Sequence, residues 1–309
     1  MTYSIVARDE ASGAMGVACQ SHFFAPGAVV TWAEPGVGVV ATQAFVDGRY
    51  GQQSLAGLRA GRPAEQIVAD LISYDPHPEV RQFALVGRNG SAAVHTGEAC
   101  IESTGALSLG GVAVQGNMLA NDQVLPAMMD AYLKEPYLDG PDGLARRLLR
   151  AMRAGEDAGG DVRGSQGAVL VVVDGEPTDA PWNHKPIDLR VDDHVDPITE
   201  LERLLELRLA FDPVYQTMFA PGLMVGGYHE PNPGDLERTR RELEQSIVVV
   251  EPNQEARFWL GVLLARSGSI PEARQELRAT YAVNPGLTAM TRRLVTAGIL
   301  TEHEYEELQ

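Results

Sequence analysis

The chain has 309 residues, of which 44% are hydrophobic and 22% are charged, and its formal net charge is −17. This composition is typical of a folded globular protein. The acidic excess argues against nucleic acid or an anionic membrane surface as the main partner, because both require a positively charged face. The apolar runs are also too short to span a bilayer.

Strand patterns dominate the first 115 residues. Short turn segments rich in glycine, proline and asparagine separate most of these patterns, which predicts hairpins. Apolar residues at helical spacing from Ile67 to Ile72 follow Pro63 and predict one helix among them. The expected strands cover residues 2–8, 14–20, 29–33, 37–44, 81–87, 91–95, 99–102 and 111–115.

Two helices and two strands are predicted next. The helices carry apolar stripes around Met128 and Leu148, and the strands cover residues 166–173 and 187–191. The order shows no regular βαβ alternation, so we expect an α+β domain over residues 1–210 with antiparallel sheets and helices packed outside them. Two stacked sheets between helical layers would use these elements well.

The remaining residues are predicted to form a linker and a small helical region. Asp196 is a candidate N-cap for a helix that begins at Pro197. Residues 211–234 are rich in glycine, proline and methionine, which predicts a linker or docking loop, and residues 235–309 are helical in pattern. We also expect a homo-oligomer, in which the methionine- and glycine-rich stretch 218–227 could lie in the interface.

Residues 254–285 resemble a tetratricopeptide (TPR) repeat. Small residues at Gly261 and Ala273 would let two paired helices approach closely, and Pro285 lies where the repeat ends. A single repeat is too short to be stable alone. The helices could therefore brace the main domain or a dimer, or they could form a groove that binds a protein partner.

Glycine-flanked polar clusters recur along the first 200 residues, and the segments around them resemble a known family. The segments are SIVARDEASGAMGVACQSHFF, GVGVVATQA, VQGNMLA, AGGDVRGSQGA and IDLRVDDHVDP. They resemble the bacterial family catalogued as domain of unknown function 1028, in order and over residues 2–208. The resemblance implies an N-terminal-nucleophile (Ntn) hydrolase-like fold, a four-layer αββα sandwich.

The same resemblance makes Thr2 a candidate nucleophile. Ntn hydrolases cleave amide bonds with a Thr, Ser or Cys at the mature N-terminus, where the free α-amine acts as the base. Thr2 gains a free amine only after Met1 is removed, which a small second residue generally permits. No lysine precedes Lys134 to act as an auxiliary base. Thr2 could instead be an ordinary β-branched strand residue.

Asp161 and Arg163 lie in a glycine-flanked loop before a buried strand. They could orient the nucleophile or clamp a substrate carboxylate, with loop amides as an oxyanion hole, or they could form an ion pair that closes the turn. We expect catalytic roles for Thr2, Asp161, Arg163 and Asn117.

Several neutral side chains are candidate substrate-binding groups. Amides near strand ends could orient an amide substrate or satisfy buried backbone groups, and Ser21 with His22 could be a nucleophile and base only if both point the same way. This set consists of Ser21, His22, Gln43, Gln115 and Gln166.

No cofactor or metal site is predicted. The sequence lacks a Walker loop, a Rossmann fingerprint and zinc-finger spacing, and the acidic cluster 192–194 is better suited to cap the next helix. The start of the chain shows no charged and apolar leader, and two cysteines provide no disulfide framework, so we expect a cytoplasmic location.

Three functional hypotheses follow. The first is an Ntn-type amidohydrolase that acts on a small or peptide-like amide. The second is a non-catalytic interaction protein that uses its TPR-like helices. The third is a hydrolase with an internal nucleophile such as Ser21, which would leave Met1 in place.

Overall fold

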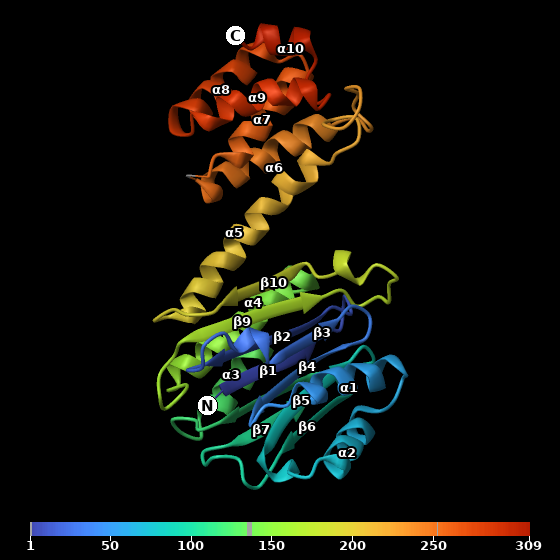
Figure 1. The fold of residues 1–309 in the computed structure, drawn as a ribbon, viewed down its shortest axis with the longest axis vertical. Coiled ribbons are helices and arrows are strands. Elements are labelled where there is room, and N and C mark those ends of the chain that lie inside the picture. Colours follow the sequence, from blue (N-terminus) through green and yellow to red (C-terminus); the bar gives the residue numbers. More distant parts are fainter. Residues whose placement is uncertain (1, 135–137, 252) are drawn as a thin grey trace. The chain divides into compact units, whose positions relative to one another are not determined.

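The computed structural model describes residues 2–134, 138–251 and 253–309, and it divides into two compact units (Figure 1). The first unit extends to Leu205, and the second runs from Glu206 to Gln309. The first is a mixed α/β unit with antiparallel sheets, and the second is helical. None of the helices within the described residues is long and apolar enough to cross a bilayer.

The larger sheet of the first unit has six strands in the order β10-β9-β2-β1-β8-β7, and every neighbouring pair is antiparallel. The strand β1 lies inside the sheet, between β2 and β8, so its backbone is paired on both sides. The strands are β1 (Thr2–Arg8), β2 (Met15–Ser21), β7 (Gly105–Leu109), β8 (Val112–Asn117), β9 (Gly167–Val173) and β10 (Ile187–Val191).

The smaller sheet has four antiparallel strands in the order β3-β4-β5-β6. Apolar side chains from both sheets pack into one core between them, with Val6 and Val17 from the larger sheet against Val39 and Val86 from the smaller. The strands are β3 (Thr31–Glu34), β4 (Gly38–Ala44), β5 (Arg81–Gly87) and β6 (Ala92–Thr96).

Each sheet carries a helix pair on its other face. Helices α1 (Gly48–Arg59) and α2 (Ala64–Tyr74) pack on the smaller sheet, whereas α3 (Val124–Leu133) and α4 (Gly140–Asp157) pack on the larger one. The prediction of antiparallel sheets with helices packed outside is therefore confirmed.

A fully buried ion pair ties the first hairpin to α4. Arg147 donates to the carboxylate of Asp9 at 3.0 Å, and neither side chain is exposed to solvent. The Arg147 guanidinium also lies over the ring of Tyr132, at 4.4 Å from its centroid. Breaking such a pair on one side would leave an uncompensated buried charge, so this contact fixes α4 against the sheet.

One predicted strand was wrong, and two elements were not predicted. Residues 99–102 form a turn and bend, not a strand, because the amides of Ala99 and Cys100 donate to loop carbonyls rather than to a neighbouring strand. The sequence reading missed the helix α1 and the edge strand β7. β7 has only five residues and most of them are exposed, so it offers only a short and weak strand signal.

The second unit is helical and has its own core. It begins within α5 (Pro197–Met218), so the expected linker does not start at Phe211: residues 211–218 are helical, and Val214 is buried in the helical core. The loop 219–234 contributes Leu223 and Met224 to that core. The other helices are α6 (Asp235–Val250), α7 (Glu255–Arg266), α8 (Ile270–Val283), α9 (Gly286–Thr296) and α10 (Glu302–Glu307).

Candidate functional site

The core between the two sheets is apolar at one end and polar at the other. On β1 the residues that face the smaller sheet change from Val6 to Ser4 and Thr2. Because side chains alternate along a strand, this face can be followed at every second residue. The other strands contribute polar residues at the same end: Ser21, Gln43, Gln82, Gln115 and Asn117.

Three buried amide side chains form a connected network at this polar end. The side-chain oxygen of Gln82 accepts hydrogen bonds from Gln43 Nε2 at 2.7 Å and from Asn117 Nδ2 at 2.9 Å. Gln82 Nε2 in turn donates to the carbonyl of Gly116 at 2.9 Å. Gln82 thus connects β5 of one sheet to β8 of the other.

A second part of the network lies deeper. Ser4 Oγ donates to Gln43 Oε1 at 2.7 Å, and Gln115 Nε2 donates to Ser4 Oγ at 3.2 Å and to the carbonyl of Ala41 at 3.0 Å. Gln115 is fully buried and does not line the cavity described next. Its place in the network is that of a buried support for Gln43.

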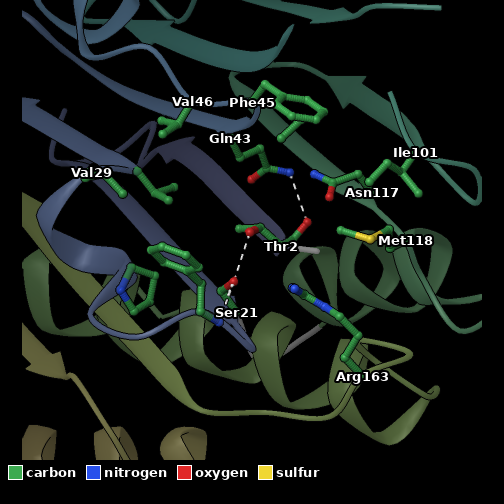
Figure 2. A pocket seen from close by; sticks show the side chains of 14 residues that line it. Thr2, Ser21, Val29, Gln43, Phe45, Val46, Ile101, Asn117, Met118 and Arg163 are labelled. Carbon is green, nitrogen blue, oxygen red and sulfur yellow. Dashed lines mark hydrogen bonds between the residues drawn. The ribbon is translucent and has the colours of Figure 1, made fainter. Parts of the chain in front are cut away.

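A cavity of about 280 Å³ opens above this polar end (Figure 2). Thr2, Ser21, Gln43, Asn117 and Arg163 contribute its polar lining. The cavity therefore brings together five of the residues predicted from the sequence. The rest of the lining is mostly apolar: Phe23, Pro26, Val29, Val30, Ala44, Phe45, Val46, Ile101 and Met118.

Thr2 is the first residue of β1, and its hydroxyl faces the cavity. Thr2 and Ser21 lie directly opposite each other on β1 and β2, and Thr2 Oγ1 donates to Ser21 Oγ at 3.1 Å. Gln43 Nε2 donates to the Thr2 carbonyl oxygen at 3.0 Å. The hydroxyl of Thr2 is thus held by β2, and its carbonyl is held by β4 of the other sheet. A reacting group needs such a fixed position.

Asp161 organises the loop beside Thr2. Its carboxylate is buried and accepts from the backbone amides of His22 at 3.2 Å and Arg163 at 2.8 Å. The Arg163 guanidinium donates to the same carboxylate, with Nη2 at 3.2 Å. Gly159 and Gly164, with φ of 121° and 94°, allow the tight path of this loop. The pair closes the turn, and it also places Arg163 in the cavity lining.

Tyr3 fixes the start of β1 from the opposite face. Its hydroxyl donates to Glu156 Oε2 on α4 at 2.5 Å, and Ser165 donates to the other oxygen of the same carboxylate. Burial of the phenol, followed by the nearby Glu156 carboxylate, raises the pKa of Tyr3 well above its ordinary value. Tyr3 therefore stays protonated and acts as a hydrogen-bond donor at neutral pH.

Besides Asp161 and Gln115, two further predicted residues lie outside the cavity lining. His22 is exposed, and its backbone amide rather than its ring contacts Asp161. Gln166 Nε2 donates to Asp193 Oδ1 at 3.2 Å. In the same region, Asp196 caps α5 by accepting from the amide of Thr199 at 3.1 Å. Across the described residues, no three His, Cys, Asp or Glu side chains are grouped to hold a metal ion.

The sequence reading missed Gln82 and the apolar walls. Gln82 could have been found by following alternation along β5, where Ala84 and Val86 belong to the core between the sheets and Gln82 lies on the same face. Phe23, Phe45 and Ile101 lie in loops, where no periodicity indicates direction. Only the assembled fold brings these three to one cavity.

Comparison with known proteins places the chain in a family. The sequence model described as "Family of unknown function (DUF1028)" matches residues 2–201. The chain belongs to this family. The matched range covers nearly all of the first unit and every lining residue of the cavity, so the DUF1028 domain of this protein contains the whole candidate site.

A solved member of the family is similar in structure. The crystal structure of protein SPO2555 from Silicibacter pomeroyi, also of the DUF1028 family, has 30% sequence identity and a TM-score of 0.59. The alignment covers 66% of this chain and 88% of that one. No curated protein matches the chain.

Proposed function

We propose that the DUF1028 domain of this protein is an Ntn-type amidohydrolase with a four-layer αββα sandwich, and that Thr2 is its nucleophile. The observation that carries the proposal is the position of Thr2: the first residue of a central strand, with its hydroxyl in the cavity and hydrogen-bonded to Ser21. Two facing sheets, each with a helix pair on its outer face, support the fold assignment.

In the proposed reaction, removal of Met1 frees the α-amine of Thr2. That amine takes the proton of Oγ1 as the oxygen attacks the substrate carbonyl, which gives a tetrahedral oxyanion. The proton then passes to the leaving amine as the C–N bond breaks. Water hydrolyses the resulting ester of Thr2 and restores the hydroxyl. An α-amine suits this role because its pKa is near the working pH, roughly 7.7–8.0.

The other polar lining groups have roles that follow from their positions. Ser21 orients Oγ1 through the 3.1 Å hydrogen bond. Asn117 and Arg163 are the side-chain donors of the cavity lining suited to stabilise the oxyanion. Asp161 positions Arg163 and does not itself line the cavity.

The test begins with the intact mass of untagged protein made in a bacterial cytoplasm. We expect loss of Met1, and then amide hydrolysis in a substrate panel that Thr2→Ala abolishes and Thr2→Ser partly retains. Thr31→Ala is a matched control, because Thr31 is also the first residue of a strand but lies outside the cavity lining. Complete retention of Met1 would rule out Thr2 as the nucleophile.

A second candidate is a hydrolase that uses Ser21 as an internal nucleophile. It is favoured by one observation: Ser21 Oγ shares the cavity with Thr2 Oγ1 and would need no removal of Met1. In that case Ser21→Ala abolishes turnover and Thr2→Ala does not. If Thr2 is the nucleophile, Ser21→Ala lowers the rate but leaves measurable turnover.

For the helical unit we propose a TPR-like packing of α7 against α8, which would make it a protein-binding module. Gly261 supports this assignment, because a Cβ at that position would lie 2.7 Å from Leu277 Cγ on the facing helix. A groove lined by Phe211, Tyr215 and Met218 lies in this unit. If the protein acts only through these helices, no amide in the panel is hydrolysed, and deletion of residues 211–309 abolishes capture of a partner.

A further inference from the structure

We infer that the cavity takes a small, uncharged amide whose main substituent is apolar. The chemistry of this inference rests on the proposed amidohydrolase function, but the binding preference can be measured without turnover. A volume of about 280 Å³ is suited to a small molecule. It lies just below the usual range for small-ligand pockets, about 300–1,000 Å³, which favours a small ligand.

The first argument is the exposure of large apolar side chains around the cavity. Phe23 is 62% exposed, Phe45 is 56% exposed and Ile101 is 50% exposed, and all three line the cavity. They come from three different loops, yet they surround the same polar floor (Figure 2 labels Phe45 and Ile101). Exposed apolar side chains gathered at one cavity indicate a surface that another apolar group covers.

The second argument is the charge of the lining. Within the part of the chain that the structure describes, Arg163 is the ionisable side chain of this lining, and its guanidinium is paired with the buried carboxylate of Asp161. No carboxylate lines the cavity among those residues, so a cationic substrate would lose its hydration without an opposite charge. An anionic substrate would have to compete with Asp161 for Arg163, and the α-amine that loss of Met1 frees at Thr2 is neutral in the base form that the proposed reaction uses. The lost hydration disfavours cationic ligands, and the competition with Asp161 disfavours anionic ones.

The third argument is the polar floor. The groups nearest to Thr2 are neutral: the hydroxyl of Ser21 and the amides of Gln43 and Asn117. Gln43 is fixed by hydrogen bonds to Thr2 and Gln82, so the floor is ordered before a ligand arrives. One neutral amide above this floor and an apolar group against the walls would match the two surfaces of the cavity.

The test compares three amides of similar length that differ at the far end: hexanamide, adipamic acid and ε-aminocaproamide. Their affinities are measured by calorimetry and ligand-observed NMR on the full chain carrying Thr2→Ala, so that hydrolysis does not interfere. We expect hexanamide to bind about tenfold or more tightly than either charged analogue, because each analogue must bury a terminal charge. Equal binding of all three, or tighter binding of a charged one, would overturn the inference.

Phe23 and Phe24 provide a matched pair of variants. They are neighbours with nearly equal exposure, 62% and 61%, but only Phe23 lines the cavity. In the Thr2→Ala background, Phe23→Ala should weaken hexanamide binding several-fold, and Phe24→Ala should leave it unchanged. Phe45→Ala should act in the same direction as Phe23→Ala. If Phe23→Ala and Phe24→Ala bind hexanamide equally, the apolar group does not occupy this cavity.

The same experiment separates the inference from the proposed function. Selective hexanamide binding with no turnover by the unsubstituted protein would leave the inference standing and reject the amidohydrolase. Turnover confined to charged amides, together with no hexanamide binding, would reject the inference and leave the amidohydrolase standing.

Discussion

Gln82 has more connections than any other side chain of the candidate site, although it does not line the cavity. Its oxygen accepts from both Gln43 and Asn117, at 2.7 and 2.9 Å. A buried acceptor shared by two donors fixes the position of both. Gln82 therefore determines where two cavity-lining amides lie.

Replacing Gln82 with leucine should destabilise the first unit. The substitution keeps the size of the side chain but removes the shared acceptor, and it leaves buried donors without that partner. We expect a loss of about 2 kcal/mol in the free energy of unfolding, measured by chemical denaturation. Gln52→Leu, at an exposed position of α1, is the control and should change stability by less than about 0.5 kcal/mol. Equal effects would mean that the network contributes little.

At the residue scale the sequence predicted the polar floor better than the walls. Thr2, Ser21, Gln43 and Asn117 lie on strands, and they are polar residues at the ends of predicted strands, which is visible in the sequence. Residues such as Phe45 lie in loops and reach the cavity only because the turns between strands bring them there. Nothing local in a loop sequence encodes that direction, so these residues could not be predicted.

At the scale of elements, one acidic residue joins α2 to β5. Asp75 ends α2 and accepts from Arg81 Nε and from Tyr50 Oη, each at 2.8 Å. The hydrogen bond from Arg81, together with those from His77 and Tyr50, holds the pKa of Asp75 well below its ordinary value despite its burial. The folded state is therefore more stable when this carboxylate is ionised than when it is protonated.

A pH dependence of stability follows from that lowered pKa. Above the unfolded value of about 3.9 the carboxylate is ionised in both states and its full contribution is present. As the pH falls below this value, the unfolded chain takes up the proton first, so stability is lost until the folded pKa is reached. We expect wild-type stability to fall more steeply below about pH 4 than that of Asp75→Asn, by up to about 1.4 kcal/mol per pH unit.

Tyr50→Phe provides a graded comparison for this prediction. It removes one hydrogen bond to Asp75 and keeps the pair with Arg81. Its pH profile, from urea unfolding at a series of pH values, should lie between those of the wild type and Asp75→Asn. Identical profiles for all three proteins would show that Asp75 does not couple to folding.

The helix pair α7–α8 allows a second prediction at this scale. Alanine is normally favoured over glycine inside a helix, by about 0.5–1 kcal/mol. At Gly261, however, an added Cβ would lie 2.7 Å from Leu277 Cγ in a packed core, so Gly261→Ala should destabilise the helical unit by about 1–3 kcal/mol. Thermal unfolding of the single variants and of Gly261→Ala with Leu277→Ala would check this, because the double variant should be less than additive.

Gly48→Ala is the control for that pair. Gly48 is also helical, but a Cβ there would meet Trp32 at 3.4 Å, an ordinary contact distance. We expect no loss of stability. A loss in Gly48→Ala equal to that in Gly261→Ala would mean that the cost does not come from the contact with Leu277.

Strands and helices were predicted correctly from the sequence where one face of the element, or the whole element, is buried. The strands 81–87 and 187–191 were predicted with the bounds that the structure has. The helix α1 was missed because its sequence, GRYGQQSLAGLR, contains three glycines and few apolar residues. Gly51 is required there, since a Cβ would lie 2.3 Å from the ring of Trp32. Tertiary packing thus overrides a weak local preference for helix.

At the scale of the whole molecule, α5 supplies apolar residues to two separate cores. Its first turns bury Ile198, Leu201 and Leu205 within the first unit, and its later turns bury Val214 in the core of the second. The glycine, proline and methionine content of residues 211–234 predicted a linker, but the helix continues through Pro213 to Met218. A chain with two cores connected in this way need not unfold in one step.

We therefore expect two unfolding transitions in calorimetry, and each should respond to its own substitution. Gln82→Leu should lower the midpoint of one transition only, and Gly261→Ala should lower the other, because each residue lies in a different core. Hydrogen exchange read at β1 and at α7 would assign the transitions to the units. A single transition shifted equally by both substitutions would show instead that the two cores unfold as one cooperative structure. In that case α5 would transmit the loss of one core to the other, and the helical unit would contribute directly to the stability of the candidate site.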